Sequence, residues 1–250
     1  MHKNIGILKE EELVLSLNEK HVSELSRNLR YMIKEMYGLI DDNALVKAEL
    51  IDGFKKPDIK VSINNCEHFI SVKSGRSDVV HQENIKKFCL YLREKGISNR
   101  TLSTILYFQY GDGTKDGSGK ERMSYEELIY KLKDRIKEAN EELNKDKDFV
   151  WDVILRTTFN GTTDEGPFAD YIYHGDVSYG VIASINQIYR HCSRRDWKFY
   201  NNLHIGPIHI RPHARYFNKP IKKEESRQKI DFAWINLNAD IDYISSRYDG

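Results

Sequence analysis

The clearest pattern of apolar positions in the chain predicts a helix from about Glu24 to Leu39. Apolar residues recur there at steps of three and four, which places them on one stripe of a helix. Gly38 is a suitable stop for this helix. The residues of the stripe are Leu25, Leu29, Met32, Ile33 and Met36.

The next region alternates between apolar and polar residues, which is typical of strands. Ile59 to Ile63 and Phe69 to Lys73 flank a polar break at Asn64 to Glu67, so the pair predicts a β-hairpin. A turn centred between Asn65 and Cys66 predicts that Asp58 lies opposite Lys73, and Lys60 opposite Ser71, on one face. An odd-length loop would break that register. The apolar face would carry Ile59, Val61, Ile63, His68, Ile70 and Val72.

The rest of the chain mixes helical and strand-like patterns. We expect helices at Asp78 to Lys95, with Ser77 or Asp78 as N-cap, and from a capping box at Ser124 and Glu127 to about Asn144. Between them, Leu102 to Tyr110 is predicted as a buried strand, followed by a glycine-rich loop at 111–119. Further strand-like runs are Val150 to Thr158 and Val181 to Ile188.

Composition favours a soluble, intracellular protein that needs no disulfide bond or structural metal to fold. The chain has 250 residues, and no stretch approaches the 18 consecutive apolar residues of a membrane span. Acidic residues near the N-terminus argue against a secretory leader. Three cysteines at unrelated spacings suit reduced thiols, so we expect a cytoplasmic location.

Charge is unevenly distributed along the chain, although the net charge is only +1. From His191 to Ile230 there are ten basic residues and three acidic ones, a local excess of +7, interleaved with Trp197, Tyr200 and Tyr216. Such a segment favours double-stranded DNA as a partner. The other interpretation is a charged surface with nothing bound. The candidate DNA-binding residues are Arg194, Arg195, Lys198, Arg211, Arg215, Lys222 and Lys223.

The chemically strongest pattern is Pro57-Asp58 followed, after twelve residues, by Ser71-Val72-Lys73. A carboxylate can bind a hard divalent cation, and a nearby ammonium can orient or help to deprotonate an attacking water. This is the chemistry of metal-assisted phosphodiester hydrolysis. The alternative is a cross-strand salt bridge without catalysis.

The order of helix, hairpin with Pro-Asp and x-x-Lys, helix and then buried strand resembles the common core of the PD-(D/E)XK nuclease superfamily, which includes many restriction endonucleases. The resemblance covers roughly Glu24 to Tyr110. It implies an α/β (mixed α+β) fold with a central mixed sheet flanked by helices, and a Mg²⁺-dependent deoxyribonuclease. It also implies a homodimer, because cutting both strands requires two sites.

One position departs from the family pattern, because Ser71 stands where the family has an acidic residue two before the lysine. Some restriction endonucleases look similar, with Ser-x-Lys and a carboxylate taken from the following helix; here the candidates are Glu83 and Asp78. Glu35, on the preceding helix, is a further candidate metal ligand. Weaker options are Glu49, Asp52 and Glu67, while His81 and Gln82 could contact the scissile phosphate.

We therefore expect a type II restriction enzyme in which Asp58 and Glu83 bind Mg²⁺ and Lys73, with Ser71 beside it, acts on water. The alternatives are a nuclease-like DNA-binding module without activity and a repair or recombination nuclease. No pattern for zinc or for a serine hydrolase is present. We expect one domain over 1–250, with a core at about 24–110 and a DNA-contacting elaboration at about 148–250.

Overall fold

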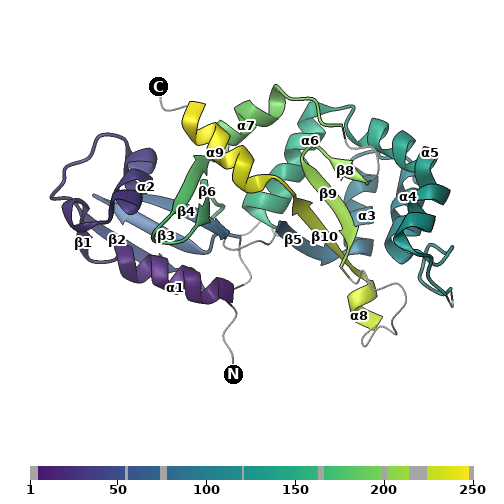
Figure 1. The fold of residues 1–250 in the computed structure, drawn as a ribbon, viewed down its shortest axis with the longest axis horizontal. Helices are drawn as coiled ribbons and strands as arrows, with labels where there is room; N and C mark the ends of the chain where they lie inside the picture. Colours follow the sequence, from purple (N-terminus) through teal and green to yellow (C-terminus); the bar gives the residue numbers. More distant parts are fainter. Residues whose placement is uncertain are drawn as a thin grey trace. The chain divides into compact units, whose positions relative to one another are not determined.

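A computed structural model describes residues 5–53, 56–73, 78–119, 121–162, 166–198, 202–213 and 224–247 of the chain (Figure 1). The chain divides into two compact units, and the single domain expected from the sequence stays a prediction. None of the helices in these ranges is long and apolar enough to cross a bilayer. The first unit is Met1–Ser77, Leu155–Arg194 and Asn236–Gly250; the second is Asp78–Ile154 and Arg195–Ile235.

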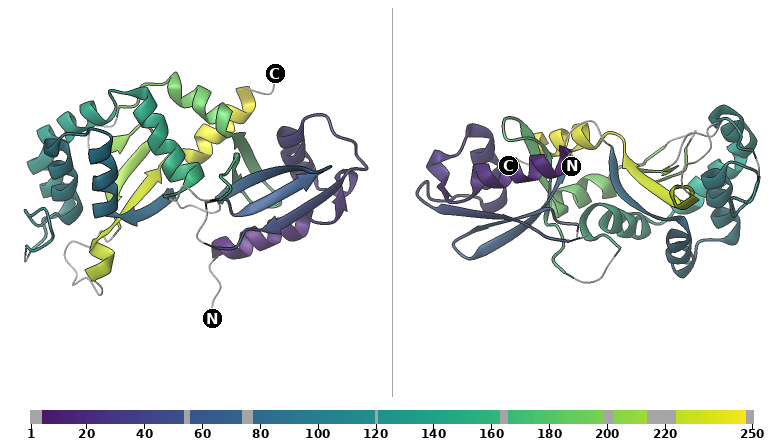
Figure 2. Two further views of the ribbon diagram at one scale, coloured as in Figure 1. Left: turned by 180° about the vertical axis from the view of Figure 1, so that it is seen from behind. Right: turned by 90° about the horizontal axis from the view of Figure 1, so that it is seen from below.

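The first unit contains a six-stranded mixed sheet with the order β1-β2-β3-β4-β6-β7 (Figures 1 and 2). Strands β4 and β6 are parallel, and the other neighbours are antiparallel. The expectation of a mixed sheet with helices is therefore confirmed. The strands are β1 Lys20–His21, β2 Leu45–Leu50, β3 Ile59–Ile63, β4 Cys66–Lys73, β6 Tyr171–Gly175 and β7 Gly180–Ser184; the helices are α1 Ile5–Leu17, α2 Arg27–Tyr37, α7 Ile185–Ser193 and α9 Leu237–Arg247, with a 3₁₀ turn at Val22–Glu24.

Helices α1 and α2 bury their apolar stripes in the core of the first unit. Leu13 and Leu17 of α1 and Ile33 of α2 join Val61 and Ile70 of the hairpin in one buried cluster. Helix α2 is the amphipathic helix predicted at 24–39, shortened at both ends. Ser26 Oγ accepts a hydrogen bond from Leu29 N at its start, and Gly38 with a φ of 70° ends it.

The second unit contains an antiparallel four-stranded sheet with the order β5-β10-β9-β8. One face of this sheet packs against helices: Phe232 of β10 meets Phe88 of α3 edge to face at 4.7 Å, and α4 and α5 contact β9 and β8. The strands are β5 Val79–Asn84, β8 His204–Ile205, β9 Ile208–Pro212 and β10 Lys229–Trp234; the helices are α3 Ile85–Glu94, α4 Asn99–Tyr110, α5 Tyr125–Leu143, α6 Lys147–Ile154 and α8 Glu224–Arg227.

Two predicted strands are helical in the structure. Leu102 to Tyr110 lies within α4, and Val150 to Thr158 is covered by α6 and a π-helical segment, Leu155–Asn160. Both runs are nearly continuous in apolar residues, and periodicity alone does not distinguish a buried strand from a buried helix. In α4 the helix begins at a Ser98 cap, which accepts a hydrogen bond from Thr101 N.

The helix predicted at Asp78 to Lys95 is also partly wrong. Its first part is β5, which pairs with β10, and the helix α3 begins only after Asn84, whose Oδ1 accepts a hydrogen bond from Lys86 N. The β-branched Val79 and Val80 suit a strand once a partner strand is available. Similarly, the run from Val181 to Ile188 divides into β7 and α7 at Ser184, which caps the helix.

The glycine-rich loop at 111–119 and the helix after it follow the prediction. The buried carboxylate of Asp112 organises the loop by accepting hydrogen bonds from Thr114 N at 2.9 Å, Gly119 N at 3.1 Å and Arg227 Nη2 at 3.0 Å. Helix α5 then begins with Ser124 Oγ accepting from Glu127 N at 3.2 Å.

Candidate active site

The predicted hairpin is formed by β3 and β4, and its turn fixes where Asp58 lies. Asn64 and Asn65 form the turn with φ values of 50° and 64°. Positive φ at both central residues is the mark of a type I′ turn, which matches the twist of two antiparallel strands. Ile63 therefore pairs with Cys66, and Ile59 pairs with Ile70.

The predicted register was wrong by two residues, because the turn is centred one residue earlier than expected. Continuing the observed pairing places Asp58 opposite Ser71 rather than Lys73, and Lys60 lies opposite Phe69. A displacement of two residues keeps every side chain on the same face of the sheet. Asp58, Ser71 and Lys73 consequently still share one face, and Ile59, Val61 and Ile70 are buried on the other.

Asp58, Ser71 and Lys73 form a hydrogen-bonded group, called the hairpin cluster below. Asp58 Oδ2 accepts from Val72 N at 2.6 Å and from Ser71 Oγ at 3.3 Å, and it lies 3.6 Å from Lys73 Nζ. Lys73 Nζ in turn donates to Ser71 Oγ at 2.9 Å and to Val72 O at 3.1 Å. The Ser71 hydroxyl therefore links the carboxylate to the ammonium.

The hairpin cluster is partly shielded from water. The side chains of Lys73 and Asp58 are 18% and 22% exposed, and Ser71 is fully buried. Charge–charge interactions are stronger at such a position than at a fully exposed one, because water screens them less. The remaining exposure still leaves both charged groups accessible to a substrate.

Glu10 of α1 is the acidic residue that sequence reasoning overlooked. Burial raises its pKa, the negative charge of Asp58 raises it further, and the positive charge of Lys73 lowers it. Glu10 is thus within electrostatic reach of the hairpin cluster. The sequence spacing could have identified Glu10, because it precedes Leu13 by three residues and Leu17 by seven. In a helix this spacing puts its carboxylate on the same stripe as these buried leucines.

Two further basic side chains surround the hairpin cluster. Burial lowers the pKa of Lys56 well below its usual value, and the positive charge of Lys73 adds to this, while Asp58 opposes it. His174 pairs with Lys73 in the parallel β4–β6 ladder, so both side chains project from the same face. Burial lowers the pKa of His174, which favours its neutral form.

The two acids predicted to replace the missing carboxylate lie in the second unit. Glu83 is on strand β5 rather than on a helix; it is buried, and its Oε1 lies 3.8 Å from His81 Nε2. Asp78 is not a helix N-cap, because strand β5 follows it and Asn84 caps α3. Its carboxylate is instead bound by both terminal nitrogens of Arg211, one of them at 2.8 Å. That either acid joins Asp58 at a metal stays a prediction.

The other predicted acids have partners elsewhere in the first unit. Lys60 Nζ binds Glu49 at 2.6 Å and Glu67 at 3.1 Å, so these two acids form a surface ion pair network. Glu35 lies close enough to Tyr171 to raise the pKa of that phenol, after burial and Asp170. Asp52 is exposed.

The donor set suits Mg²⁺ better than a structural metal. Among the described residues, no group of three or more His, Cys, Asp or Glu side chains could hold a metal ion. Mg²⁺ commonly binds through one or two carboxylates and keeps several waters or phosphate oxygens as its other ligands. Asp58 and Glu10 offer two carboxylates whose mutual repulsion a cation would relieve, so the hairpin cluster with Glu10 fits this ion.

The predicted DNA-binding residues are distributed over different elements. Arg194 is the exposed C-cap of α7, and the Arg195 guanidinium lies 4.4 Å from the ring centre of Trp197. Lys198 is exposed, whereas Arg211 lies on β9 and is bound to Asp78. Arg215, Lys222 and Lys223 lie outside the described residues.

No protein-family model matches this chain, and no curated protein sequence is significantly similar to it.

Proposed function

We propose that this protein is a Mg²⁺-dependent DNA endonuclease of the restriction type, with a restriction-endonuclease-like core formed by the first unit. The observation that supports this most strongly is the hairpin cluster, in which Asp58, Ser71 and Lys73 converge with Lys73 Nζ 3.6 Å from Asp58 Oδ2. The mixed sheet with helices is the kind of scaffold that the resemblance to PD-(D/E)XK nucleases implies.

In the proposed reaction each side chain has a distinct task. Asp58 and Glu10 would hold Mg²⁺, which supplies a Lewis acid for the phosphate and a lower pKa for the attacking water. Lys73 would orient that water and offset the negative charge that builds up on the phosphate. Ser71 keeps Lys73 Nζ in place through its 2.9 Å hydrogen bond, and the Asp58 carboxylate is fixed by Val72 N.

Asp58 accepts a backbone hydrogen bond from Val72 N of β4, which fixes the position of its carboxylate. Carboxylate oxygens are the ligands that a hard cation prefers. The type I′ turn and the ladder between β3 and β4 hold this geometry without any flexible segment between the two charged residues. This rigidity supports catalysis, because catalytic groups need fixed relative positions.

A cleavage assay tests the proposal. Wild-type protein incubated with Mg²⁺ and long duplex DNA of mixed sequence should produce discrete fragments, and a chelator should prevent this. Asp58→Asn and Lys73→Met should each lower the rate by at least about a hundredfold, the scale expected for a lost catalytic group. Lys60→Met is the matched control, because Lys60 lies in the same hairpin and forms its ion pairs with the surface acids Glu49 and Glu67. Full cutting by Asp58→Asn or Lys73→Met would contradict the proposal.

A second function is a DNA-binding module without nuclease activity, and Ser71 favours it, because a serine cannot supply the family's second carboxylate. Double-stranded DNA would remain the partner, and a homodimer would still match a two-fold symmetric site. Binding of DNA by wild-type protein without any cleavage in Mg²⁺ would favour this function. Nicking confined to branched or damaged DNA would instead favour a repair nuclease.

A further inference from the structure

The four-stranded sheet of the second unit has two faces of opposite character. Phe232 and Ile230 of β10 and Ile210 of β9 are buried, and Phe232 packs against α3. Because side chains alternate along strands, the residues between these positions project from the opposite face. The pairing places Gln82, Asp231 and Arg211 side by side across β5, β10 and β9 on that face.

The opposite face, called the polar face below, carries a connected set of hydrogen bonds. Asp231 Oδ1 accepts from Gln82 Nε2 at 2.9 Å and lies 3.0 Å from His213 Nδ1. Arg211 donates to both carboxylate oxygens of Asp78, with Nη1 to Oδ2 at 2.8 Å. These acids fix the orientation of the amide, imidazole and guanidinium groups before any partner binds, which lowers the entropy cost of binding.

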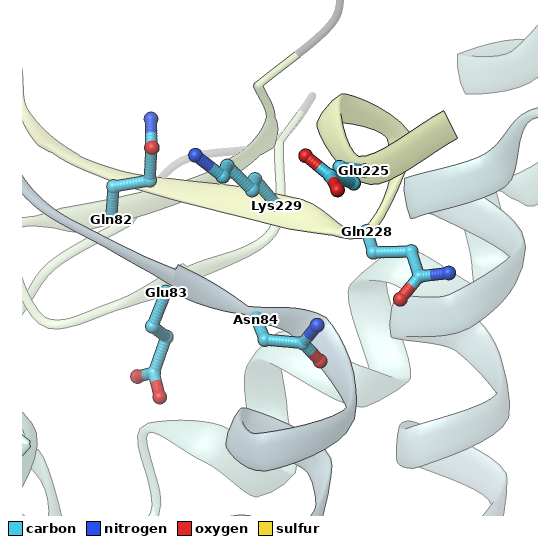
Figure 3. Close-up of a pocket in the computed structure, with 6 residues that line it drawn as sticks. All are labelled: Gln82, Glu83, Asn84, Glu225, Gln228 and Lys229. Carbon is cyan, nitrogen blue, oxygen red and sulfur yellow. The ribbon is translucent and has the colours of Figure 1, made fainter. Parts of the chain in front are cut away.

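The side chains of the polar face differ in their exposure to solvent. Gln82, His213 and Lys229 are exposed, and Asn84 and Arg211 are half-buried. Figure 3 shows that Gln82 and Lys229 project from the same side of the β5–β10 pair, whereas Glu83 points to the other side. Glu83 therefore belongs to the helix-covered face and not to this surface.

A polar cavity of about 330 Å³ lies where β5 ends and β10 begins, and residues of both sheet faces line it (Figure 3). Amide, carboxylate and ammonium groups line it, and none of the described lining residues is apolar, so it does not suit an apolar ligand. Its side chains both donate and accept hydrogen bonds. The lining residues are Gln82, Glu83, Asn84, Glu225, Gln228 and Lys229.

The side chains of the polar face match the edges of DNA bases better than a protein partner. Gln and Asn form paired hydrogen bonds with adenine, and Arg forms them with guanine. The core of a protein interface instead uses buried aromatic and aliphatic anchors, which the set Gln82, Asn84, Arg211, His213 and Lys229 does not provide.

Charge supports the same partner. The described residues stop at His213 and resume at Glu224, and the sequence between them carries Arg215, Lys219, Lys222 and Lys223 with no acid. That segment lies outside the described residues, but its composition favours a polyanion. Strand β5 is the edge strand of this four-stranded sheet, and β10 is its neighbour.

We infer that the polar face of the β5-β10-β9-β8 sheet reads base sequence in double-stranded DNA, with Gln82 and Arg211 at base edges and Lys229 at a phosphate. The inference rests on the proposed function, because it assigns sequence recognition to the second unit and cleavage to the hairpin cluster of the first. It predicts that recognition and cleavage can be impaired separately.

Selection from a pool of random-sequence duplexes tests the inference, with Asp58→Asn protein used to prevent cleavage. This protein should enrich one short motif. Adding Gln82→Ala should relax the motif at one position, lowering discrimination there by about tenfold or more. Adding Lys229→Ala should weaken binding to all sequences alike and reduce the salt dependence by about one phosphate contact. Lys133→Ala, an exposed lysine of α5, is the control and should change neither property.

The outcomes separate the inference from the proposed function. Enrichment of the same motif by the parent and by Gln82→Ala, or DNA binding by the parent without any enriched motif, would overturn the inference. Wild-type protein that neither binds nor cuts DNA would overturn the proposed function as well. Circular dichroism of each variant shows that it is folded, and Gln82→Glu provides a second variant, which should repel DNA while keeping the size of the side chain.

Discussion

The two sheets arrange their polar side chains in different ways. In the six-stranded sheet, Asp58, Ser71 and Lys73 converge near the end of β4, where Ser71 is hydrogen-bonded to both charged groups and Lys73 Nζ lies 3.6 Å from Asp58 Oδ2. In the four-stranded sheet, Gln82, Asp231 and Arg211 extend across three neighbouring strands. A convergent group can act on one atom of a substrate, whereas an extended one can only contact a surface. The proposed function accordingly assigns the chemistry to the first unit and the recognition of DNA to the second.

The largest expected effect is a loss of stability that distinguishes the buried face of the four-stranded sheet from its exposed face. Phe232 is fully buried against Phe88, so Phe232→Ala should lower the free energy of unfolding by about 3–5 kcal/mol. Gln82→Ala on the exposed face removes one hydrogen bond to Asp231 and should lower it by only about 1 kcal/mol. Urea unfolding measures both values. Equal losses in the two variants would contradict the assignment of one face to the core and the other to binding.

The second effect tests which unit supplies the additional carboxylate. Glu10→Gln removes the acid near Asp58 and should lower cleavage by about a hundredfold, the scale of a lost catalytic group. Glu83→Gln, a buried acid of the second unit, is the matched variant. Rates are measured at saturating and at low Mg²⁺. A large loss in Glu83→Gln with normal activity of Glu10→Gln would favour Glu83 as the ligand.

The third effect compares cysteine thiols of the two units. Cys66 is exposed, whereas burial raises the pKa of Cys89 to about 11. At pH 8 a thiol of raised pKa is mostly protonated, and only the thiolate reacts. The thiolate of such a group is a stronger nucleophile, but this compensates only in part for its low population. Alkylation of Cys89 should therefore be about twentyfold slower than that of Cys66. Mass spectrometry of iodoacetamide-treated protein measures the order. Raising the pH toward 11 should bring the alkylation rates of Cys66 and Cys89 closer together. Equal alkylation rates of the two thiols at pH 8 would contradict the burial of Cys89.

The smallest effect concerns Ser71. Ser71→Ala removes the hydroxyl that links Lys73 to Asp58, and one such hydrogen bond is worth about 1–1.5 kcal/mol, or roughly a tenfold loss of cleavage. The Michaelis constant for DNA should change little, because the hydroxyl positions Lys73 and does not contact the substrate. A loss as large as that of Lys73→Met would mean that Ser71 has a more direct role.

Local pattern in the sequence predicted the hairpin, its two faces, helix α2 and helix α5. The apolar alternation of Ile59, Val61 and Ile63 and the capping box at Ser124 each involve residues close together in the sequence, so they can be recognised without a fold. The hairpin register was nearly right, and the remaining error came from the turn, where Asn64 and Asn65 both adopt positive φ.

Only the tertiary structure decided which distant residues meet. Asp78 binds Arg211, 133 residues further along the chain, and β5 is a strand because β10 pairs with it. Glu10 approaches Asp58 because helix α1 packs against the sheet through Leu13 and Leu17. The sequence by itself determined that Asp58 and Lys73 share one face of a hairpin, since that depends on local alternation. The neighbours of the pair depend on long-range packing, which no local pattern encodes.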